Sequence, residues 1–275
     1  MHRFFLSPEK LAREPLMLDG DEAHHAANVL RVRVGERLNV LDGAGTEAVC
    51  NVTEVTKRRV GLEVAEKKFS PRPRGQITLC QALVKGKAFD FILQKATELG
   101  AARIVPVQCE RSVVQADAAH DAADKLAKWR ATMIEAAKQC GIRWLPQIEE
   151  PITPAEFLAR GEKFDFAMVG SLGPQRVHPR ECFREFRRAH SRGAESVCVW
   201  IGPEGDFSPR ELAMLREAGV RGVTLGANVL RADTAALAAV AVCSYEMSAE
   251  DGESSKLKAQ SSREGPEGKD QSGRG

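Results

Sequence analysis

A glycine-rich loop between an apolar run and a helix start is the segment best suited to bind a ligand. The apolar residues 197–201 predict a strand, and residues 202–205 after it read Gly-Pro-Glu-Gly. A helix start follows, with Ser208 as the N-cap, Pro209 as the first helical residue and Glu211 as the third. Glycine lets a ligand approach the backbone, and ligands of open α/β sheets bind beyond the carboxyl ends of strands. A tight strand-to-helix turn would need the same glycines, so this loop alone leaves both interpretations open.

A second loop also connects the end of a predicted strand to the start of a helix. A predicted strand ends at Leu225 and Gly226, a short loop follows, and an alanine-rich helix begins near Asp233 or Thr234, either of which could cap it. The alanines by themselves are typical of a closely packed core helix. Two strand-end loops of this kind in succession favour one shared binding pocket.

Arginines are clustered in the first part of the chain, although the net charge of the whole chain does not indicate what it binds. The sequence has 40 Lys+Arg against 38 Asp+Glu, and a net charge of +2 does not indicate a nucleic-acid-binding protein. Each arginine taken singly is best explained as a solvated surface residue. Several on one small domain could instead form a groove that neutralises phosphates. They are Arg31, Arg33, Arg37, Arg58, Arg59, Arg72 and Arg74.

The first seventy residues predict short strands joined by tight turns. Runs of alternating apolar residues at 37–41, 48–55 and 59–64 are separated by Gly/Asp turns, a pattern typical of a small β-barrel or sandwich. Residues 43–48 match the G-x-G-x-x-A pattern of dinucleotide-binding proteins. That motif requires a helix next, and a strand-like run follows here, so we interpret it as a hairpin turn.

The pattern of predicted secondary structure changes after a linker. Two prolines and a glycine within residues 70–75 break both periodicities. Predicted strands then alternate with helical patterns as far as residue 247, which indicates an α/β domain with a mainly parallel sheet. We therefore predict a β-barrel domain over 1–70, a linker over 71–75, an α/β domain over 76–247 and a disordered polar tail over 248–275.

Several classes of protein are disfavoured. No apolar stretch approaches the roughly 20 residues of a membrane-spanning helix, and the N-terminus lacks a secretory signal pattern. The seven cysteines include no C-x-x-C pair, which argues against disulfide scaffolds and cysteine-based zinc sites. We expect no bound metal, no membrane association and a cytoplasmic location.

The order of the motifs resembles a known family. The loop from Ile201 to Gly205 followed by Leu225-Gly226-x-x-Val229-Leu230-Arg231 is similar to the knotted SPOUT methyltransferases, and within them to the RsmE-type family. The resemblance runs from Arg3 to about Tyr245. Its other matching segments are His24-x-x-x-x-Val29-Leu30-Arg31 and residues 95–100, 110–112 and 135–140.

Two positions depart from the family pattern. The family has Gly-Gly-Phe where this chain has Gly205, Asp206 and Phe207, and it has Glu where this chain has Asp233. Asp206 replaces a residue that is free to adopt positive φ, so the loop could bend differently. Asp233 keeps the carboxylate but shortens its reach by one methylene.

The resemblance implies a trefoil-knotted SPOUT-type α/β domain preceded by a PUA-like β-barrel that binds RNA. It implies S-adenosylmethionine as the cofactor, held largely by backbone groups, and a homodimer formed through the knotted domain. The cofactor-binding residues that it implies are Leu172, Gly202, Pro203, Glu204, Gly205, Leu225, Gly226, Val229, Leu230 and Thr234.

The resemblance also implies the reaction, which is methylation of uridine N3 in 16S ribosomal RNA, in the decoding region of the small subunit. N3 lies on the Watson–Crick edge, so the target base must be unpaired or flipped out, and arginines could stabilise the developing uracil oxyanion. The candidate catalytic residues are Arg3, Arg31 and Arg231, and the candidate RNA-binding residues are Arg3, Arg31, Arg33 and Arg111.

Two other functions stay open. A catalytically silent RNA-binding or ribosome-assembly factor could share the fold, and Asp206 and Asp233 are the sequence features that favour it. A metabolic α/β enzyme with a nucleotide cofactor ranks last, because the chain lacks a phosphate-binding loop.

Overall fold

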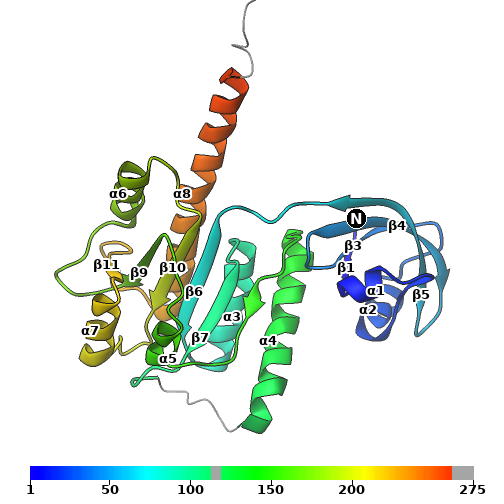
Figure 1. The fold of residues 1–275 in the computed structure, drawn as a ribbon. Helices are drawn as coiled ribbons and strands as arrows, with labels where there is room; N and C mark the ends of the chain where they lie inside the picture. The colour runs from blue at the N-terminus through cyan, green and yellow to red at the C-terminus, as the bar shows by residue number, and fades with distance from the viewer. Residues whose placement is uncertain (113–118, 262–275) are drawn as a thin grey trace, which may run out of the picture.

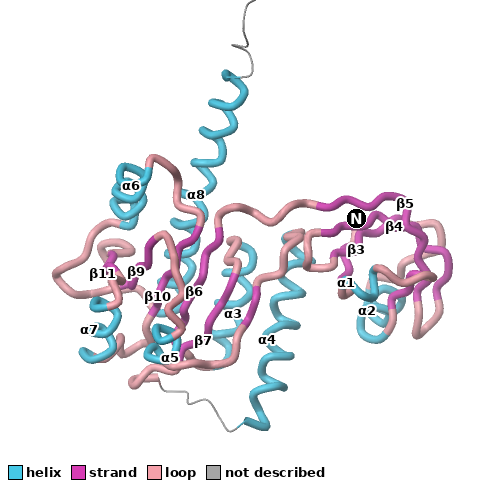
Figure 2. The backbone as a smooth tube through the Cα atoms, viewed as in Figure 1, coloured by secondary structure: helices cyan, strands magenta, loops and turns pink. Residues whose placement is uncertain are grey.

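The computed structural model describes residues 1–112 and 119–261. Two sheets lie side by side and are joined by a linker that passes the ends of α3 (Gly86–Glu98) and α4 (Ala119–Cys140), as Figure 1 shows. The smaller sheet comes from the N-terminal part of the chain and the larger sheet from the rest (Figure 2). The residue bounds of the β domain, the linker and the α/β domain stay a prediction from the sequence.

The small sheet is a curled half-barrel. Its strands lie in the order β1 (Arg3–Phe5), β3 (Arg37–Leu41), β4 (Thr46–Val55), β5 (Val60–Phe69) and β2 (Leu16–Leu18). The edge strands β1 and β2 do not pair with each other, so the sheet stays open where we expected a barrel. Short helical segments line it, namely α1 (Pro8–Leu11), α2 (Gly20–His24) and the π-helix η1 (His25–Val29).

The turn between β3 and β4 confirms the hairpin interpretation. The Asp42 carboxylate accepts hydrogen bonds from the backbone N–H groups of Ala44 and Thr46, both at 2.8 Å, and β3 pairs antiparallel with β4. Gly45 has φ +99°, and a Cβ there would lie 2.7 Å from the Trp144 ring. Glycine is therefore needed both for the turn and for its docking on the second domain.

The large sheet has six parallel strands. Their order is β11 (Arg221–Val223), β9 (Phe166–Gly170), β10 (Ser196–Ile201), β6 (Gln76–Ala82), β7 (Arg103–Val107) and β8 (Gln147–Ile148). The mainly parallel sheet predicted from the sequence is confirmed. The two central strands, β10 and β6, are almost wholly buried, which explains why their sequences read as continuous apolar runs.

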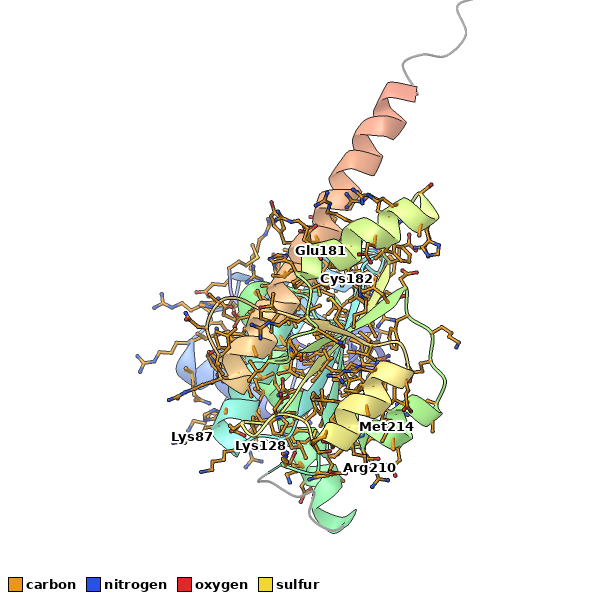
Figure 3. All side chains as sticks on the ribbon, turned by 90° about the vertical axis from the view of Figure 1, so that its left-hand side faces the viewer. Lys87, Lys128, Glu181, Cys182, Arg210 and Met214 are labelled. Carbon is orange, nitrogen blue, oxygen red and sulfur yellow. The ribbon has the colours of Figure 1, made fainter. Side chains whose placement is uncertain are left out.

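Helices cover both faces of this sheet. Val197 and Val199 belong to the core cluster that includes side chains of α3, α4, α6 (Pro179–His190) and α8 (Ala232–Ser261). Cys198 and Trp200 belong to the cluster on the other face, with side chains of α5 (Pro154–Ala159) and α7 (Pro209–Glu217). Alternate residues of a strand point to opposite faces. Figure 3 shows α6 and α8 on the side opposite to α7, which carries Arg210 and Met214.

The C-terminal helix is longer than the sequence indicated. We placed the start of a disordered tail at residue 248, but α8 continues to Ser261. Extending a formed helix costs far less than nucleating one, so a polar segment can follow a buried helical one without breaking it. The remainder of the predicted tail, 262–275, lies outside the described residues.

The two domains dock through backbone groups and a few charged side chains. The Gly45 N–H donates to the Arg143 carbonyl at 2.9 Å, and the Leu145 N–H donates to the Gly43 carbonyl at 3.0 Å. The Arg143 guanidinium also contacts the Glu47 carboxylate at 2.6 Å. These contacts fix the small sheet against the segment that follows α4.

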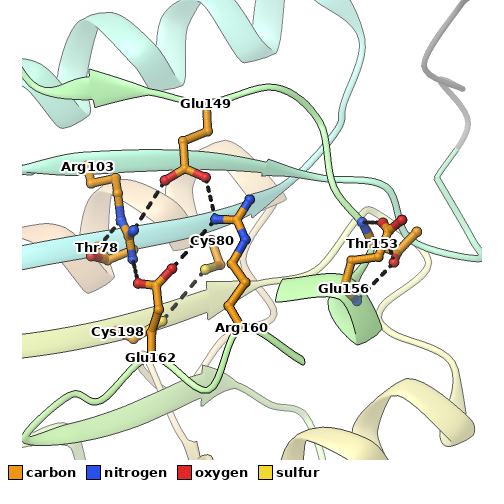
Figure 4. Close-up of polar contacts among 9 residues, drawn as sticks. All are labelled: Thr78, Cys80, Arg103, Glu149, Thr153, Glu156, Arg160, Glu162 and Cys198. Atoms are coloured by element: carbon orange, nitrogen blue, oxygen red, sulfur yellow. Dashed lines mark hydrogen bonds and ion pairs between the residues drawn. The ribbon is translucent and has the colours of Figure 1, made fainter. Parts of the chain in front are cut away.

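A charged network ties the β8 edge of the large sheet to its neighbouring loops (Figure 4). The Arg103 guanidinium contacts the carboxylates of Glu149 and Glu162, and the Arg160 guanidinium contacts Glu149 at 2.6 Å. Arg103 also lies over the Phe157 ring, with its guanidinium carbon 5.6 Å from the ring centroid. The hydrogen bond from Arg103 lowers the pKa of the Glu162 carboxyl below its usual value.

We predict that Glu162→Gln destabilises the protein at neutral pH by about 1 kcal/mol, because a charge-assisted hydrogen bond becomes a neutral one. The folded pKa of Glu162 is lowered, so its contribution is present above the usual value of 4.5 and is lost as the pH falls below it. Denaturant unfolding should therefore show a gap between the two proteins at pH 7 that narrows in acid. Glu150→Gln, at an exposed neighbouring position, should show no such gap, and a gap that does not depend on pH would contradict the prediction.

Candidate functional site

Three loops meet at the carboxyl edge of the parallel sheet and enclose a cavity of about 330 Å³. They follow Gly170 at the end of β9, Ile201 at the end of β10 and Val223 at the end of β11. These strands are neighbours in the sheet, so their carboxyl ends lie together. The shared pocket expected from the two sequence loops is present, with a third loop added.

The loop after β10 leaves little room for a side chain at its first position. A Cβ on Gly202 would lie 3.1 Å from the Phe207 ring and 3.2 Å from the Asp206 carboxylate. Asp206 itself has φ +60°, a conformation that aspartate tolerates better than most residues. Its N–H donates to the Pro203 carbonyl at 2.9 Å, and its carboxylate accepts from the Phe207 N–H at 2.8 Å. The Asp206 departure therefore does not prevent the positive-φ turn.

The loop after β11 is exposed and partly apolar. Gly226 has φ +142°, and its carbonyl accepts a hydrogen bond from the Thr224 hydroxyl at 2.9 Å. Val229 is 75% exposed at the rim. At the start of α8 the Asp233 carboxylate accepts from the Thr234 N–H at 2.6 Å. Since α8 begins at Ala232, Asp233 and Thr234 lie within its first turn, and the prediction that one of them caps the helix is wrong.

Sequence reasoning overlooked most of the loop after β9. The Ser171 N–H donates to the Val223 carbonyl at 3.0 Å, and the Arg176 guanidinium donates to the Leu172 carbonyl at 3.0 Å. Of this loop only Leu172 was predicted, while Ser171 and Arg176 also line the cavity. The signal was available, because the loop follows a predicted strand of the same parallel sheet and contains a glycine.

Most of the predicted cofactor-binding residues line the cavity, and Arg231 lines it as well. Gly205 and Thr234 are outside the lining. The carbonyl of Gly205 instead accepts a hydrogen bond from the Arg111 guanidinium at 2.9 Å. The predicted residues that line the cavity are Leu172, Gly202, Pro203, Glu204, Leu225, Gly226, Val229 and Leu230.

The other predicted arginines lie elsewhere. Arg31 and Arg33 are exposed on the small domain, and Arg31 has φ +55°. The Arg3 guanidinium donates to the carbonyls of Lys138 and Gln139 at 3.3 and 3.0 Å. These carbonyls belong to the last turn of α4, where a cation also opposes the negative end of the helix dipole. Within one chain, the structure brings Arg231 to the cavity but not Arg3, Arg31 or Arg33.

A buried carboxylate connects two of the loops around the site. One oxygen of Glu211 accepts from the Ser208 N–H at 2.7 Å, as expected for a capping box, and the other accepts from the Glu110 N–H at 2.9 Å. Glu211 is only 3% exposed. The sequence predicted the first contact but not the second, since the partner is 101 residues away. Glu211 thus holds the exit of β7 against the loop after β10.

A buried thiol beside Glu211 belongs to Cys109. Burial is the main cause that raises the pKa of the Cys109 thiol, beside Glu211, to about 12, so this thiol stays protonated at neutral pH. Over 1–112 and 119–261 no group of His, Cys, Asp and Glu side chains could hold a metal ion. In the same ranges no helix has the length and apolar character to cross a bilayer.

Comparison with known proteins gives consistent results along the chain. Residues 70–244 match the family described as an RNA methyltransferase domain, and residues 18–64 match the RNA methyltransferase PUA domain. The ribosomal RNA small subunit methyltransferase E of Mycobacterium bovis is 33% identical over 82% of this chain and 84% of its own. The protein of the same name from Bacillus subtilis is 31% identical over 90% and 97%.

Solved methyltransferase structures have a similar fold over most of the chain. The ribosomal RNA small subunit methyltransferase E from Neisseria gonorrhoeae, bound to S-adenosyl methionine, superposes with a TM-score of 0.75 at 30% identity, over 88% of this chain and 96% of its own. A Legionella pneumophila methyltransferase in complex with the cofactor SAM gives a TM-score of 0.77 at 28% identity, over 88% and 96%. The predicted SPOUT-type fold with a preceding PUA domain is confirmed.

We predict that Glu211→Gln loosens the site, because an amide can accept from one of the two N–H groups but presents N–H to the other. The expected loss of stability is about 1–3 kcal/mol for a buried donor left without a partner. Amide hydrogen exchange should rise at Glu110 or Ser208. Glu156→Gln is the matched control, since the Glu156 carboxylate makes the same capping box with Thr153 of its own helix terminus. Equal exchange at residues 110 and 208 in both variants would refute the connecting role.

Proposed function

Because the chain belongs to the RsmE-type family of small-subunit ribosomal RNA methyltransferases, we propose that it methylates N3 of one uridine in the decoding region of 16S ribosomal RNA. The chain is an RNA methyltransferase of this family, and its cofactor is S-adenosylmethionine. The position on the base and the place in the RNA are our proposal, and they rest on the family resemblance and on the chemistry of the pocket.

The pocket suits S-adenosylmethionine, which supplies an electrophilic methyl group on a sulfonium sulfur. Its volume of about 330 Å³ is within the range of small-molecule sites. Its walls offer backbone groups of Gly202, Leu225 and Gly226, which can read the adenine edge. The Glu204 carboxylate can face the positively charged groups of the cofactor, and the Arg176 guanidinium can face its carboxylate. Each charge of the cofactor therefore has a partner of opposite sign.

The chain's own contribution to the reaction is chiefly positioning. Holding two reactants in line can lower a barrier by about 7–11 kcal/mol. Uracil N3 carries a proton that must leave before or during attack, which makes negative charge develop on the two carbonyl oxygens of the base. Of the candidate catalytic arginines, Arg231 alone lines the cavity, and we propose that its guanidinium stabilises this charge.

The remaining arginines receive other roles in this proposal. Arg31 and Arg33, exposed on the small domain, contact the RNA. We propose that Arg111 acts on the RNA only indirectly, because its guanidinium holds the Gly205 carbonyl. Arg3 docks the small domain on α4, which makes it a positioning residue more than a catalytic one.

A second copy of the chain would complete the site. Leu172 and Val229 at the pocket rim are 56% and 75% exposed, and apolar rims of this kind are commonly covered by a partner. We propose a homodimer formed through the knotted domain, with Arg31 of one chain contributing to RNA binding at the site of the other. The substrate, 16S ribosomal RNA or the small subunit, implies a cytoplasmic location.

A catalytically silent RNA-binding factor is the second candidate. The Asp206 and Asp233 substitutions favoured it, but Asp206 adopts the turn that the family glycine would adopt. The methyl-transfer proposal is therefore preferred. The observation that carries it is the convergence of three strand-end loops around one cavity in a chain of this family.

We predict that the purified protein binds S-adenosylmethionine and transfers a methyl group to small subunits from a strain that lacks the gene. Mass spectrometry of the ribosomal RNA should show one 3-methyluridine. Arg231→Ala should lower kcat about 10²–10³-fold, the usual cost of removing one oxyanion donor, and leave cofactor affinity within about threefold. Cofactor binding without any methylated uridine would favour the silent factor, and methylation at another atom would refute the N3 assignment.

We predict that Arg31→Ala weakens RNA binding and leaves cofactor binding intact, because Arg31 lies outside the cavity. Losing one phosphate contact should also reduce the slope of log affinity against log salt concentration by about one unit. Filter binding over a salt series measures the first effect and calorimetry with S-adenosylmethionine the second. Equal loss of both affinities would indicate misfolding and contradict the assignment.

A further inference from the structure

A second cavity, of about 220 Å³, lies at the junction of the two domains. It is bounded by the linker, by the segments that follow α3 and α4, and by the middle of α8. Arg72 and Ser248 at its rim are exposed, whereas Ile77 and Met247 in its wall are 3% and 6% exposed. We call it the junction cavity.

The junction cavity is separate from the cofactor pocket. It contains Gln76 and Ile77 at the amino end of β6, while the cofactor pocket lies at the carboxyl edge of the sheet. The seven residues of β6, at about 3.3 Å each, place the two sites roughly 20 Å apart. A group bound in the junction cavity therefore cannot be the group that reacts in the same chain.

An ordered indole ring forms one wall. The Trp144 N–H donates to the Ser70 carbonyl at 2.9 Å, and the missing side chain of Gly45 lets the backbone lie directly against the ring. The guanidinium carbon of Arg72 lies 5.4 Å from the centroid of Trp144. Phe69 meets Trp144 edge to face, with centroids 6.1 Å apart. Phe69 is nevertheless 63% exposed, so an aromatic surface faces solvent beside the opening.

The surroundings are positively charged. Arg72 is the one charged residue among the described residues that line the cavity, and Arg74, Lys67 and Lys68 are exposed on the adjoining chain segment. The volume is below the roughly 300 Å³ of the smaller small-molecule sites. The cavity therefore suits one flat ring of a longer anionic molecule.

We propose that the junction cavity binds the base of an unstacked RNA nucleotide, distinct from the nucleotide that is methylated. The base enters beside Trp144 and Arg72, and Arg72, Arg74 and Lys68 neutralise the neighbouring phosphates. Stacking on aromatic and guanidinium planes is how proteins hold single-stranded RNA with little sequence preference. The inference rests on the proposed function, because that function makes RNA the substrate. The RNA would thereby be anchored where the two domains meet.

The test uses the full chain and two variants that alter the cavity differently. Ser244→Leu fills the cavity from α8 without changing charge, since Ser244 lines it and is half-buried. Arg72→Gln removes the charge at the exposed rim. We expect each to weaken binding to unmethylated small subunits about tenfold and to raise KM for RNA at unchanged kcat, with unchanged S-adenosylmethionine affinity. Arg188→Gln removes an exposed arginine of α6 and should stay within about twofold of wild type.

A second measurement locates the contact. Ribosomal RNA fragments that carry 4-thiouridine should crosslink under ultraviolet light to peptides containing Phe69 or Trp144, and Ser244→Leu should abolish these crosslinks. Wild-type RNA affinity in both cavity variants, or crosslinks that avoid these peptides, would overturn the proposal. A changed oligomeric state at unchanged RNA affinity would also overturn it, in favour of a second copy over the cavity. A wild-type protein that neither binds the cofactor nor transfers a methyl group would instead overturn the proposed function.

Discussion

The parallel pairing of β9, β10 and β11 is the constraint on which the site depends. Val197 to Trp200 of β10 pair with Phe166 to Val169 of β9, and β11 continues from β9 on its other side. This register ends all three strands at one edge. Backbone N–H and C=O groups beyond the last ladder bonds have no strand partner and must find another. A pocket built from such groups offers main-chain atoms to a ligand, which fits the predominance of glycine and aliphatic residues in its walls.

Long-range contacts then hold those loops in place. Glu211 connects the loop after β10 to the exit of β7, and Arg111 reaches the Gly205 carbonyl from the same exit. The small domain is oriented in a similar way, because Arg3 binds the last carbonyls of α4 and a glycine turn lies against Trp144. Glu211, Arg111 and Arg3 all make these contacts with backbone N–H or carbonyl groups. These contacts set the position of the small domain relative to the loops around the cavity.

The sequence anticipated most of the local structure around the site. The capping box at Ser208 and Glu211, the hairpin after β3 and the linker before β6 are set by interactions within a few residues, so pattern reasoning could find them. The three-residue strands β1 and β2 escaped it, because such short segments show no periodicity and are strands only through their neighbours. The third loop of the pocket was recognised only at Leu172. Its hydrogen bond from Ser171 to Val223 joins residues too far apart in the chain for pattern reasoning to pair them.

What the sequence by itself determined were the helix caps, the glycine turns, the alternation of strands and helices and the family of the motifs, all of which depend on neighbouring residues. Only the tertiary structure decided that Arg231 reaches the cavity while Arg3 serves α4, that Glu211 bonds to Glu110, and that Asp206 can replace a glycine. It also decided that Trp144, Arg72 and Phe69 meet beside an open cavity. The reason is physical: these roles depend on which groups are brought within hydrogen-bonding or packing distance by strand order, and strand order is not a local property of the chain.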